Sequence, residues 1–365
     1  MASFFLTTKC DLRCSYCYNS EERATIEEQS LPLHIAKAGI DHFFYTNKSR
    51  HIRFYGPGEP TQEFKLMKDI VNYARESSQE QLTVEIQTNG CFETNVREWM
   101  LENMNIIWVS VDGEPDIQNA YRPCVGEKPS SPIIEDNVKW LIENTGTRDL
   151  MVGARVTITN VNVNRQKQLV DYFQTLGIRH IWTDPLFQSV DKIPVYQDKE
   201  KQKNYCFDMD AYVDNYIDAY YYAQKKGVFY GSFLACNFDG ICSHNCRTCT
   251  PTPHFTSDGY VSACDMVTFG KNAYHMDCFV YGRWNEDTQS FEFDNKKIEQ
   301  LKKRSVENMV HCKNCVAAKH CGGYCLGEVV NETGRLDGQV TRSCNAIRKL
   351  YSALGQLDPY QYSHP

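Results

Sequence analysis

The sequence predicts an α/β protein, with a partial (β/α)6, TIM-like barrel followed by a small cysteine-rich domain. Residues 1–185 alternate strand-like runs with segments of helical apolar spacing. Residues 231–345, in contrast, carry closely spaced cysteines and little apolar periodicity. Parallel strands need crossover connections, which the helical segments would supply. We therefore expect a barrel with a connecting helix at 1–230, a cysteine-rich domain at 231–350 and a tail at 351–365.

The barrel elements follow in order along the chain. Strands, recognised by alternation and by β-branched and aromatic residues, are expected at Ser3–Thr8, His51–Tyr55, Leu82–Thr88, Ile106–Asp112, Val152–Ile158 and Arg179–Thr183. Helical apolar spacing occurs in the segments 33–44, 66–74, 96–104, 134–141 and 169–173, and a tyrosine-rich helix is expected over 209–225. In barrels of this class, the chemistry lies on loops at the carboxyl ends of the strands.

The composition excludes several classes of protein. Apolar residues make up 42% and charged residues 23%, and the net charge of −7 argues against nucleic-acid or anionic-membrane binding. The N-terminal apolar run is too short for a signal peptide or a membrane span, so we expect a cytoplasmic location, where thiols stay reduced. The seventeen cysteines cluster towards the two ends of the chain, which indicates metal ligation rather than packing.

Cys10, Cys14 and Cys17 follow the first expected strand with the spacing C-x3-C-x2-C. Three thiolates on one loop can hold three irons of a [4Fe–4S] cube and leave the fourth iron open to another ligand. The alternative is a zinc site completed by a distant residue. The spacing, with Tyr16 before the last cysteine, resembles the radical S-adenosylmethionine (SAM) superfamily. This resemblance implies that the open iron chelates SAM and that one-electron reduction yields a 5′-deoxyadenosyl radical.

The loop after the second expected strand fits the same resemblance. Gly56-Pro57-Gly58-Glu59-Pro60 stands where the family usually carries Gly-Gly-Glu-Pro, and here proline replaces one glycine of the usual pair. The resemblance implies that this loop contacts SAM largely through its backbone, which suits glycine. The residues assigned to this contact are Tyr16, Gly56, Gly58 and Glu59.

Two further strand ends resemble motifs of the branch that modifies peptides and proteins. They are Gln87-Thr88-Asn89-Gly90 and the Val-Ser-Val-Asp-Gly stretch that contains Ser110. Ser110 and Arg155 are the candidates for holding the SAM carboxylate, because an arginine fork suits a carboxylate. An ordinary surface ion pair is the alternative for Arg155.

The C-terminal cysteines resemble the signature of the SPASM region, which binds two auxiliary [4Fe–4S] clusters in radical SAM enzymes. The spacing is C-x9-G-x4-C, then C-x2-C-x5-C-x3-C, with one further cysteine beyond. The alternative is a pair of zinc sites. The resemblance assigns the first auxiliary cluster to Cys249, Cys264 and Cys325, and the second to Cys312, Cys315, Cys321 and Cys344.

The first auxiliary cluster still needs a fourth ligand. Cys242 and Cys246 both qualify, and Cys242 is preferred for its wider spacing; if neither binds, one iron is open to substrate. The expected cofactors are therefore SAM and three [4Fe–4S] clusters, one that binds SAM and two auxiliary. One of the two candidates stays unassigned, together with Cys91, Cys124, Cys206, Cys236 and Cys278.

The resemblance covers residues 1–350 and implies an enzyme that abstracts hydrogen from a residue of a ribosomally made peptide or protein. The product would carry a crosslink, a thioether or a similar oxidative modification. The alternative is an anaerobic sulfatase-maturing enzyme, which forms formylglycine; Asp265, directly after Cys264, is then the candidate catalytic base, or else a plain loop aspartate. A non-catalytic iron–sulfur electron carrier is a third hypothesis, although it gains nothing from an open iron.

The expected partners follow from this chemistry. They are a precursor peptide or protein substrate, a reductant such as flavodoxin or ferredoxin, and a separate leader-peptide-binding protein, without nucleic acid or membrane. Only nine residues precede Cys10, so we expect no fused leader-binding domain.

Overall fold

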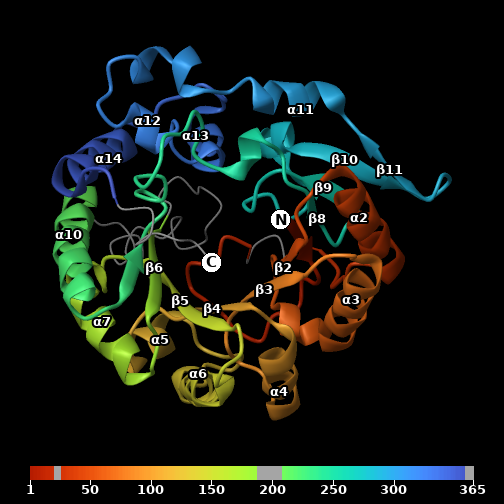
Figure 1. Cartoon of the computed structure of the whole chain (residues 1–365), viewed down its shortest axis with the longest axis horizontal. Coiled ribbons are helices and arrows are strands. Elements are labelled where there is room, and N and C mark those ends of the chain that lie inside the picture. The colour runs from red at the N-terminus through yellow and green to blue at the C-terminus, as the bar shows by residue number, and fades with distance from the viewer. Residues whose placement is uncertain (20–25, 187–207, 358–365) are drawn as a thin grey trace.

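The computed structural model describes residues 1–19, 26–186 and 208–357, in which one eleven-stranded sheet is covered by helices. The strand order is β11-β10-β9-β8-β1-β2-β3-β4-β5-β6-β7. Figure 1 shows the strands curving around a central space, with helices α2, α3, α4, α6, α7 and α10 on the outside. Because β7 and β11 are the two ends of the sheet, the barrel is open, as the sequence predicts.

The barrel wall consists of parallel strands. Their bounds are Ala2–Phe5 (β1), His51–Tyr55 (β2), Thr83–Thr88 (β3), Ile106–Ser110 (β4), Met151–Ile158 (β5), His180–Pro185 (β6) and Phe229–Gly231 (β7). The expected strands are confirmed as β1 to β6. Strand β7 is additional, because its three residues are too few to show an alternating pattern.

The outer helices cover the wall with one apolar face each. Their bounds are Leu33–Thr46 (α2), Phe64–Ser77 (α3), Thr94–Asn103 (α4), Ser131–Thr145 (α6), Gln166–Thr175 (α7) and Met209–Lys225 (α10). All six were expected. A short helix, α5 (Pro115–Tyr121), was not, because it has only two turns and few apolar residues, although Pro115 at its first turn is a typical helix start.

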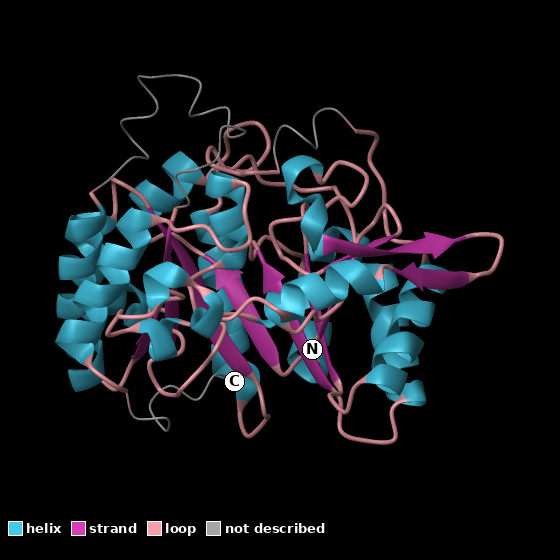
Figure 2. Ribbon diagram, turned by 90° about the horizontal axis from the view of Figure 1, so that it is seen from above, coloured by secondary structure: helices cyan, strands magenta, loops and turns pink. Residues whose placement is uncertain are grey.

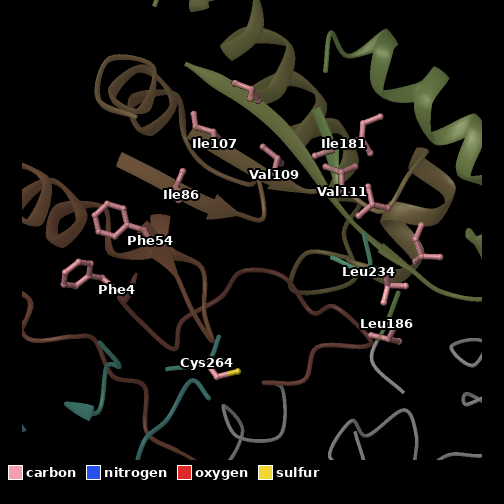
Figure 3. Close-up of a cluster of buried hydrophobic side chains, with 14 of the residues drawn as sticks. Phe4, Phe54, Ile86, Ile107, Val109, Val111, Ile181, Leu186, Leu234 and Cys264 are labelled. Carbon is pink, nitrogen blue, oxygen red and sulfur yellow. The ribbon is translucent and has the colours of Figure 1, made fainter. Parts of the chain in front are cut away.

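Alternate residues of the strands point to opposite faces of the wall. Phe4, Phe54, Ile86 and Ile107 lie together in the core between the strands and the outer helices (Figure 3). On the opposite face, which lines the interior of the barrel, Trp108 belongs to a separate small apolar cluster. The interior also carries charged residues, which the candidate site uses.

The C-terminal region continues the same sheet. Strand β8 (His254–Phe255) pairs in parallel with β1, and β9 (Tyr260–Ser262), β10 (Val280–Asn285) and β11 (Ser290–Phe293) follow as antiparallel strands. Figures 1 and 2 show the β10–β11 hairpin projecting from the body of the molecule. The sequence analysis named no strands in this region, because these strands are too short to show periodicity in the sequence.

Four helices complete this region. They are α11 (Asn295–Lys302), α12 (Ala318–Cys321), α13 (Leu326–Thr333) and α14 (Thr341–Leu354). Helix α14 packs against α10 and runs past the expected start of the tail at residue 351. Leu326 and Leu350 belong to the same hydrophobic cluster as the core between the barrel strands and the outer helices, so the region buries its apolar residues against the barrel. Within the described ranges, no helix is both long and apolar enough to cross a membrane.

Candidate functional site

Cys10, Cys14 and Cys17 lie on the loop that follows β1, here called the cluster loop (residues 9–18). All three side chains are partly buried. Burial, with smaller contributions from the thiols of Cys17 and Cys10, raises the pKa of Cys14 to about 12. The three thiols are therefore close enough to influence one another. A thiol as weakly acidic as that of Cys14 stays protonated at neutral pH unless a metal or a cation stabilises the thiolate.

A second segment, here called the strap (residues 121–125), holds the cluster loop in place. The backbone amides of Arg13 and Ser15 donate to strap carbonyls at 2.8 and 2.9 Å. The amide of Val125 donates back to a loop carbonyl at 2.9 Å. This ladder fixes the loop conformation from one side.

The Gly-Pro-Gly-Glu loop holds the cluster loop from the other side. The amides of Gly58 and Glu59 donate to the carbonyls of Thr7 and Lys9 at 3.0 and 2.7 Å. A Cβ atom on Gly58 would collide with these carbonyl groups, so only glycine allows the close approach. Gly56 has a φ of 150°, which also favours glycine. The glycines expected to contact SAM thus also position the cysteines.

Glu59 is a buried carboxylate that joins three loops. Its Oε1 accepts hydrogen bonds from the Thr61 amide (3.1 Å) and from the hydroxyls of Thr61 (2.8 Å) and Thr88 (2.7 Å). Its Oε2 accepts from the Asn89 amide at 2.7 Å. Burial raises its pKa to about 7, although these hydrogen bonds favour the ionised form. Asn89 Nδ2 in turn donates to Asp11 Oδ1 at 2.7 Å and lies 4.0 Å from Cys10 Sγ.

Tyr16 belongs to a network that the sequence analysis did not include. Its hydroxyl donates to Asp112, and Arg122 Nη1 donates to the same hydroxyl at 2.7 Å. Asp112 follows β4, and its Oδ1 accepts from the amide of Thr157 at 3.0 Å. A single arginine in a loop carries no periodicity or motif, so the sequence gives no sign of Arg122.

The two residues expected to hold the SAM carboxylate lie side by side. Ser110 and Arg155 are paired in register on β4 and β5. Arg155 forms an ion pair with Asp184 at 3.3 Å, and its guanidinium lies over the rings of Trp108 and Trp182, at 5.7 and 5.3 Å from their centroids. The ion pair that the sequence analysis left as an alternative for Arg155 is thus present inside the barrel.

Asp265 is part of an ionic cluster between the C-terminal region and the barrel wall. Its carboxylate forms an ion pair with Arg53 of β2, and its Oδ1 lies 2.8 Å from His254 Nε2 of β8. Tyr18, next to Cys17, donates to the Asp265 carbonyl at 3.4 Å. Burial opposes ionisation of the carboxyl, but the charges of Arg53 and His254 outweigh it and hold its pKa well below the ordinary 3.8. Asp265 is therefore a fixed anion beside the cluster loop.

The first C-terminal set of cysteines gathers around Cys325. Burial, with a smaller contribution from Cys246, raises the pKa of Cys325 to about 12. Burial, followed by Cys325 and then Cys246, raises the pKa of Cys264 well above its ordinary value. Cys246 also raises the pKa of Cys249, where burial is again the main cause. Cys246 therefore lies among the three expected ligands.

Cys242 has different neighbours from Cys246 in the C-terminal region. Its amide donates to the carbonyl of Lys319 at 2.7 Å, and burial followed by Asp239 and Glu307 raises the pKa of its thiol to about 11. We therefore propose Cys246, rather than the preferred Cys242, as the fourth ligand of the first auxiliary cluster.

Replacing Cys246 by alanine should weaken this auxiliary cluster, whereas replacing Cys242 should not. Iron analysis and Mössbauer spectroscopy of anaerobically reconstituted protein should show fewer cluster irons, or one iron with a non-thiolate ligand, only in Cys246→Ala. The reverse pattern would restore Cys242 as the ligand.

The second C-terminal set lines one small cavity. It has a volume of about 20 Å³, and its walls include Cys312, Cys315, Cys321 and Cys344. Burial raises the pKa of Cys321 to about 12 and that of Cys312 to about 11, with neighbouring thiols adding to both shifts. These four residues are the ones that the resemblance assigns to the second auxiliary cluster.

The donor sets fit clusters better than single metal ions. Within the described residues, no group of three or more His, Cys, Asp or Glu side chains is arranged to hold one metal ion. A zinc ion needs all its sulfur ligands at about 2.3 Å, whereas in a [4Fe–4S] cube each thiolate binds a different iron.

The other cysteines lie outside these sets. Cys91 and Cys124 are hydrogen-bonded neighbours beside the cluster loop, and burial raises the pKa of both thiols. Burial followed by Cys246 and other thiols raises the pKa of Cys236, while Cys278 lies near Asp277. Cys206 lies outside the described residues.

The fold and the cysteine-bearing loops define an open α/β barrel that carries its functional groups at the carboxyl ends of its strands. Residues 4–172 match the sequence profile of the Radical SAM superfamily. This part of the chain, somewhat less than half of its 365 residues, is a radical SAM domain.

The chain is similar to known proteins both in sequence and in structure. The chain is 24% identical over 341 residues to the cysteine-type anaerobic sulfatase-maturating enzyme of Clostridium novyi (strain NT), with 87% of this chain and 85% of that protein covered. Native anSMEcpe with bound AdoMet superposes with a TM-score of 0.75 at 17% identity, covering 97% of this chain and 96% of that one. Streptococcus suis SuiB bound to S-adenosylmethionine gives 0.62 at 16%, covering 93% and 76%. The protein thus has the fold of SPASM-type maturases.

Proposed function

We propose that the protein cleaves SAM reductively and abstracts hydrogen from a residue of a ribosomally made peptide or protein, which leads to a crosslink, a thioether or a similar oxidative modification. The observation that carries this proposal is the contact between the cluster loop and the C-terminal cysteine region through Tyr18 and Asp265. This contact places the thiols of the cluster loop and those of the first C-terminal set at the same end of the barrel. When bound, the N-terminal cluster would supply the electron that releases a 5′-deoxyadenosyl radical from SAM.

Structural neighbours support a peptide substrate. SuiB has been solved with its precursor peptide SuiA, and anSMEcpe with a peptide named Kp18Cys. An open barrel whose interior carries charged and aromatic side chains, such as Arg155 and Trp182, suits a polar peptide chain. We propose the same substrate class for this protein, with a reductant such as flavodoxin or ferredoxin and a cytoplasmic location.

We propose separate roles for the residues that would bind the clusters and those that would bind SAM. Cys10, Cys14 and Cys17 would hold the SAM-binding cluster, and the two C-terminal sets would hold the auxiliary clusters. The backbone around Gly56 and Gly58 would face SAM. Ser110 and Arg155 would take its carboxylate, with Asp184 as the competing partner of the arginine.

Formation of formylglycine in a sulfatase is the second candidate. It is favoured by the anion at Asp265 next to Cys264, by the Clostridium novyi relative and by the anSMEcpe fold. In this reaction a base must take a proton as the substrate radical is oxidised. Asp265 meets the requirement of position, although its ion pair with Arg53 makes it a weak base.

The two candidates predict different products. Anaerobically reconstituted protein should be given SAM, dithionite and either a short peptide encoded beside its gene or a cysteine-containing sulfatase peptide. Loss of two hydrogen atoms from the first peptide, seen by mass spectrometry, supports the leading proposal, and conversion of cysteine to an aldehyde in the second supports the alternative. Absence of both products, with SAM cleavage intact, would contradict peptide modification for these substrates.

A change in the second auxiliary set should separate SAM cleavage from product formation. Replacing Cys321 by alanine removes one wall of the cavity that would hold the cluster. We expect 5′-deoxyadenosine release to persist without product, because the N-terminal cluster suffices for reduction. Chromatography of the nucleoside and mass spectrometry of the peptide test this. Cys278→Ala, outside both sets, is the control, and product formation by Cys321→Ala at the wild-type rate would reduce this cluster to a structural role.

A further inference from the structure

Arg122 joins the strap to the cluster loop through its side chain. Its Nη1 donates to the Tyr16 hydroxyl at 2.7 Å, and its guanidinium carbon lies 5.9 Å from the centroid of the Tyr16 ring. Its backbone amide donates to the carbonyl of Gln118 at 2.8 Å, at the end of α5. The Tyr16 hydroxyl donates onward to Asp112. Contacts on both its backbone and its side chain therefore fix the position of the guanidinium.

The charge of this guanidinium acts on the middle cysteine of the cluster loop. The amides on either side of Cys14, those of Arg13 and Ser15, donate to the carbonyls on either side of Arg122, those of Pro123 and Tyr121, at 2.8 and 2.9 Å, so Arg122 lies opposite Cys14. Arginine is always protonated in proteins, so the charge is permanent. Within the part of the chain that the structure describes, Nε of Arg122 is buried and has no hydrogen-bond partner. The partly buried guanidinium therefore lies beside a thiol that would bind iron, and the opposing charge in the same network is the Asp112 carboxylate, which accepts from the Tyr16 hydroxyl.

We propose that Arg122 is a positioning residue of the N-terminal cluster, which compensates its negative charge and raises its reduction potential. This inference rests on the proposed function, in which Cys10, Cys14 and Cys17 are the cluster ligands. Reduction adds a negative charge next to Cys14, and a partly buried cation stabilises the reduced form more than the oxidised one. Tyr16 holds the cation in place, and Asp112 holds Tyr16. Charge and hydrogen bonding near the ligand sulfurs are known means of setting the potential of such clusters.

The test is the reduction potential of the N-terminal cluster in Arg122→Gln and Arg122→Lys. Electron paramagnetic resonance of the full-length, anaerobically reconstituted protein follows the reduced cluster at controlled potentials, and added SAM identifies the N-terminal signal by changing it. In Arg122→Gln the ratio of reduced to oxidised cluster at a fixed potential should fall about tenfold, which corresponds to about 59 mV for one electron. Arg122→Lys keeps the charge and should stay closer to the wild-type value.

Arg165→Gln is the matched control. Arg165 forms an exposed ion pair with Asp116 of α5 at 3.0 Å, so its removal takes away one positive charge near the same helix but away from the cluster loop. We expect no change in the cluster potential. If Arg122→Gln fails to incorporate iron, Arg122→Lys decides: a potential near the wild-type value supports the proposal.

Two results would overturn the inference. One is an Arg122→Gln potential equal to that of the wild type or of Arg165→Gln. The other is a reduction potential of Arg122→Lys that shifts as far as that of Arg122→Gln. If Arg122→Gln yields no cluster, the contradicting result is a tenfold fall in the ratio of reduced to oxidised cluster in Arg122→Lys. Neither result would affect the proposed function, which depends on the wild-type protein binding iron and modifying a peptide. Absence of iron from the wild type would instead remove the basis of both.

Discussion

Replacing Cys10, Cys14 and Cys17 together by alanine should remove about four irons per chain and abolish SAM cleavage. The expected wild-type content is about twelve irons, four for each of three clusters. The three thiols share one partly buried loop, and no other thiol of the proposed cluster sets lies on it. Iron analysis and the yield of 5′-deoxyadenosine with dithionite measure the two effects.

A double variant of neighbouring cysteines is the control for this experiment. Cys91 and Cys124 lie beside the cluster loop but outside the proposed ligand sets. Replacing both by alanine should leave the iron content and SAM cleavage close to wild type. Stoichiometric zinc with no iron in anaerobically prepared wild-type protein would contradict the whole assignment, as would SAM cleavage by the triple variant.

Replacing Asp265 by asparagine should lower product formation while 5′-deoxyadenosine still forms. Because the ion pair with Arg53 makes this carboxylate a weak base, we expect a loss near the low end of the roughly 10²- to 10⁴-fold contribution of a general base. Asparagine keeps the size of the side chain but neither its charge nor its ability to accept a proton. Both named contacts of the carboxylate, from Arg53 and His254, end on Oδ1, so Oδ2 is the oxygen that would meet a substrate proton. Peptide mass spectrometry and nucleoside chromatography on the same reaction separate the two readouts.

The same change also tests the ionic cluster as a structural feature. The Arg53 side chain is 11% exposed, so the loss of Asp265 removes the ion-pair partner of a largely buried cation, and we expect a lower melting temperature. The folded pKa of Asp265 lies below 3.8, so its contribution to stability is complete above about pH 4 and is lost only as the pH falls further. Asp277→Asn, which removes an exposed ion pair with Lys297, is the control. A product yield in Asp265→Asn equal to that control at every pH would reduce Asp265 to a structural residue.

The barrel was predictable from the sequence because its elements are long and periodic. Helix α3, for example, buries Met67, Ile70, Val71 and Ala74 at helical spacing. The cysteine spacings were readable for a different reason, since they are local along the chain. In contrast, β8 has two residues and depends on a partner far away in sequence, so no local pattern marks it.

Contacts between distant segments explain what the sequence analysis missed at the site. Arg122 reaches Tyr16 across 106 positions, and Arg53 reaches Asp265 across 212. Neither contact is marked by a periodic pattern in the sequence. The choice between Cys242 and Cys246 had the same origin, because spacing alone does not tell which thiol the fold turns toward Cys325. The sequence motifs were enough to predict where the site lies. The residues that contact the motif residues could be identified only from the tertiary structure.

The position of β1 in the sheet has a consequence for the synthesis of the protein. This strand, which leads directly into the cluster loop, pairs on one side with β2 and on the other with β8, so Ser3 lies opposite both Arg53 and His254. Until residues 254 and 255 have left the ribosome, one side of β1 has exposed backbone groups that no native strand covers. The nascent barrel therefore completes its sheet only late in translation, and its cluster loop reaches its final surroundings after most of the chain has been made. The contact between Tyr18 and Asp265 can likewise form only after this stage.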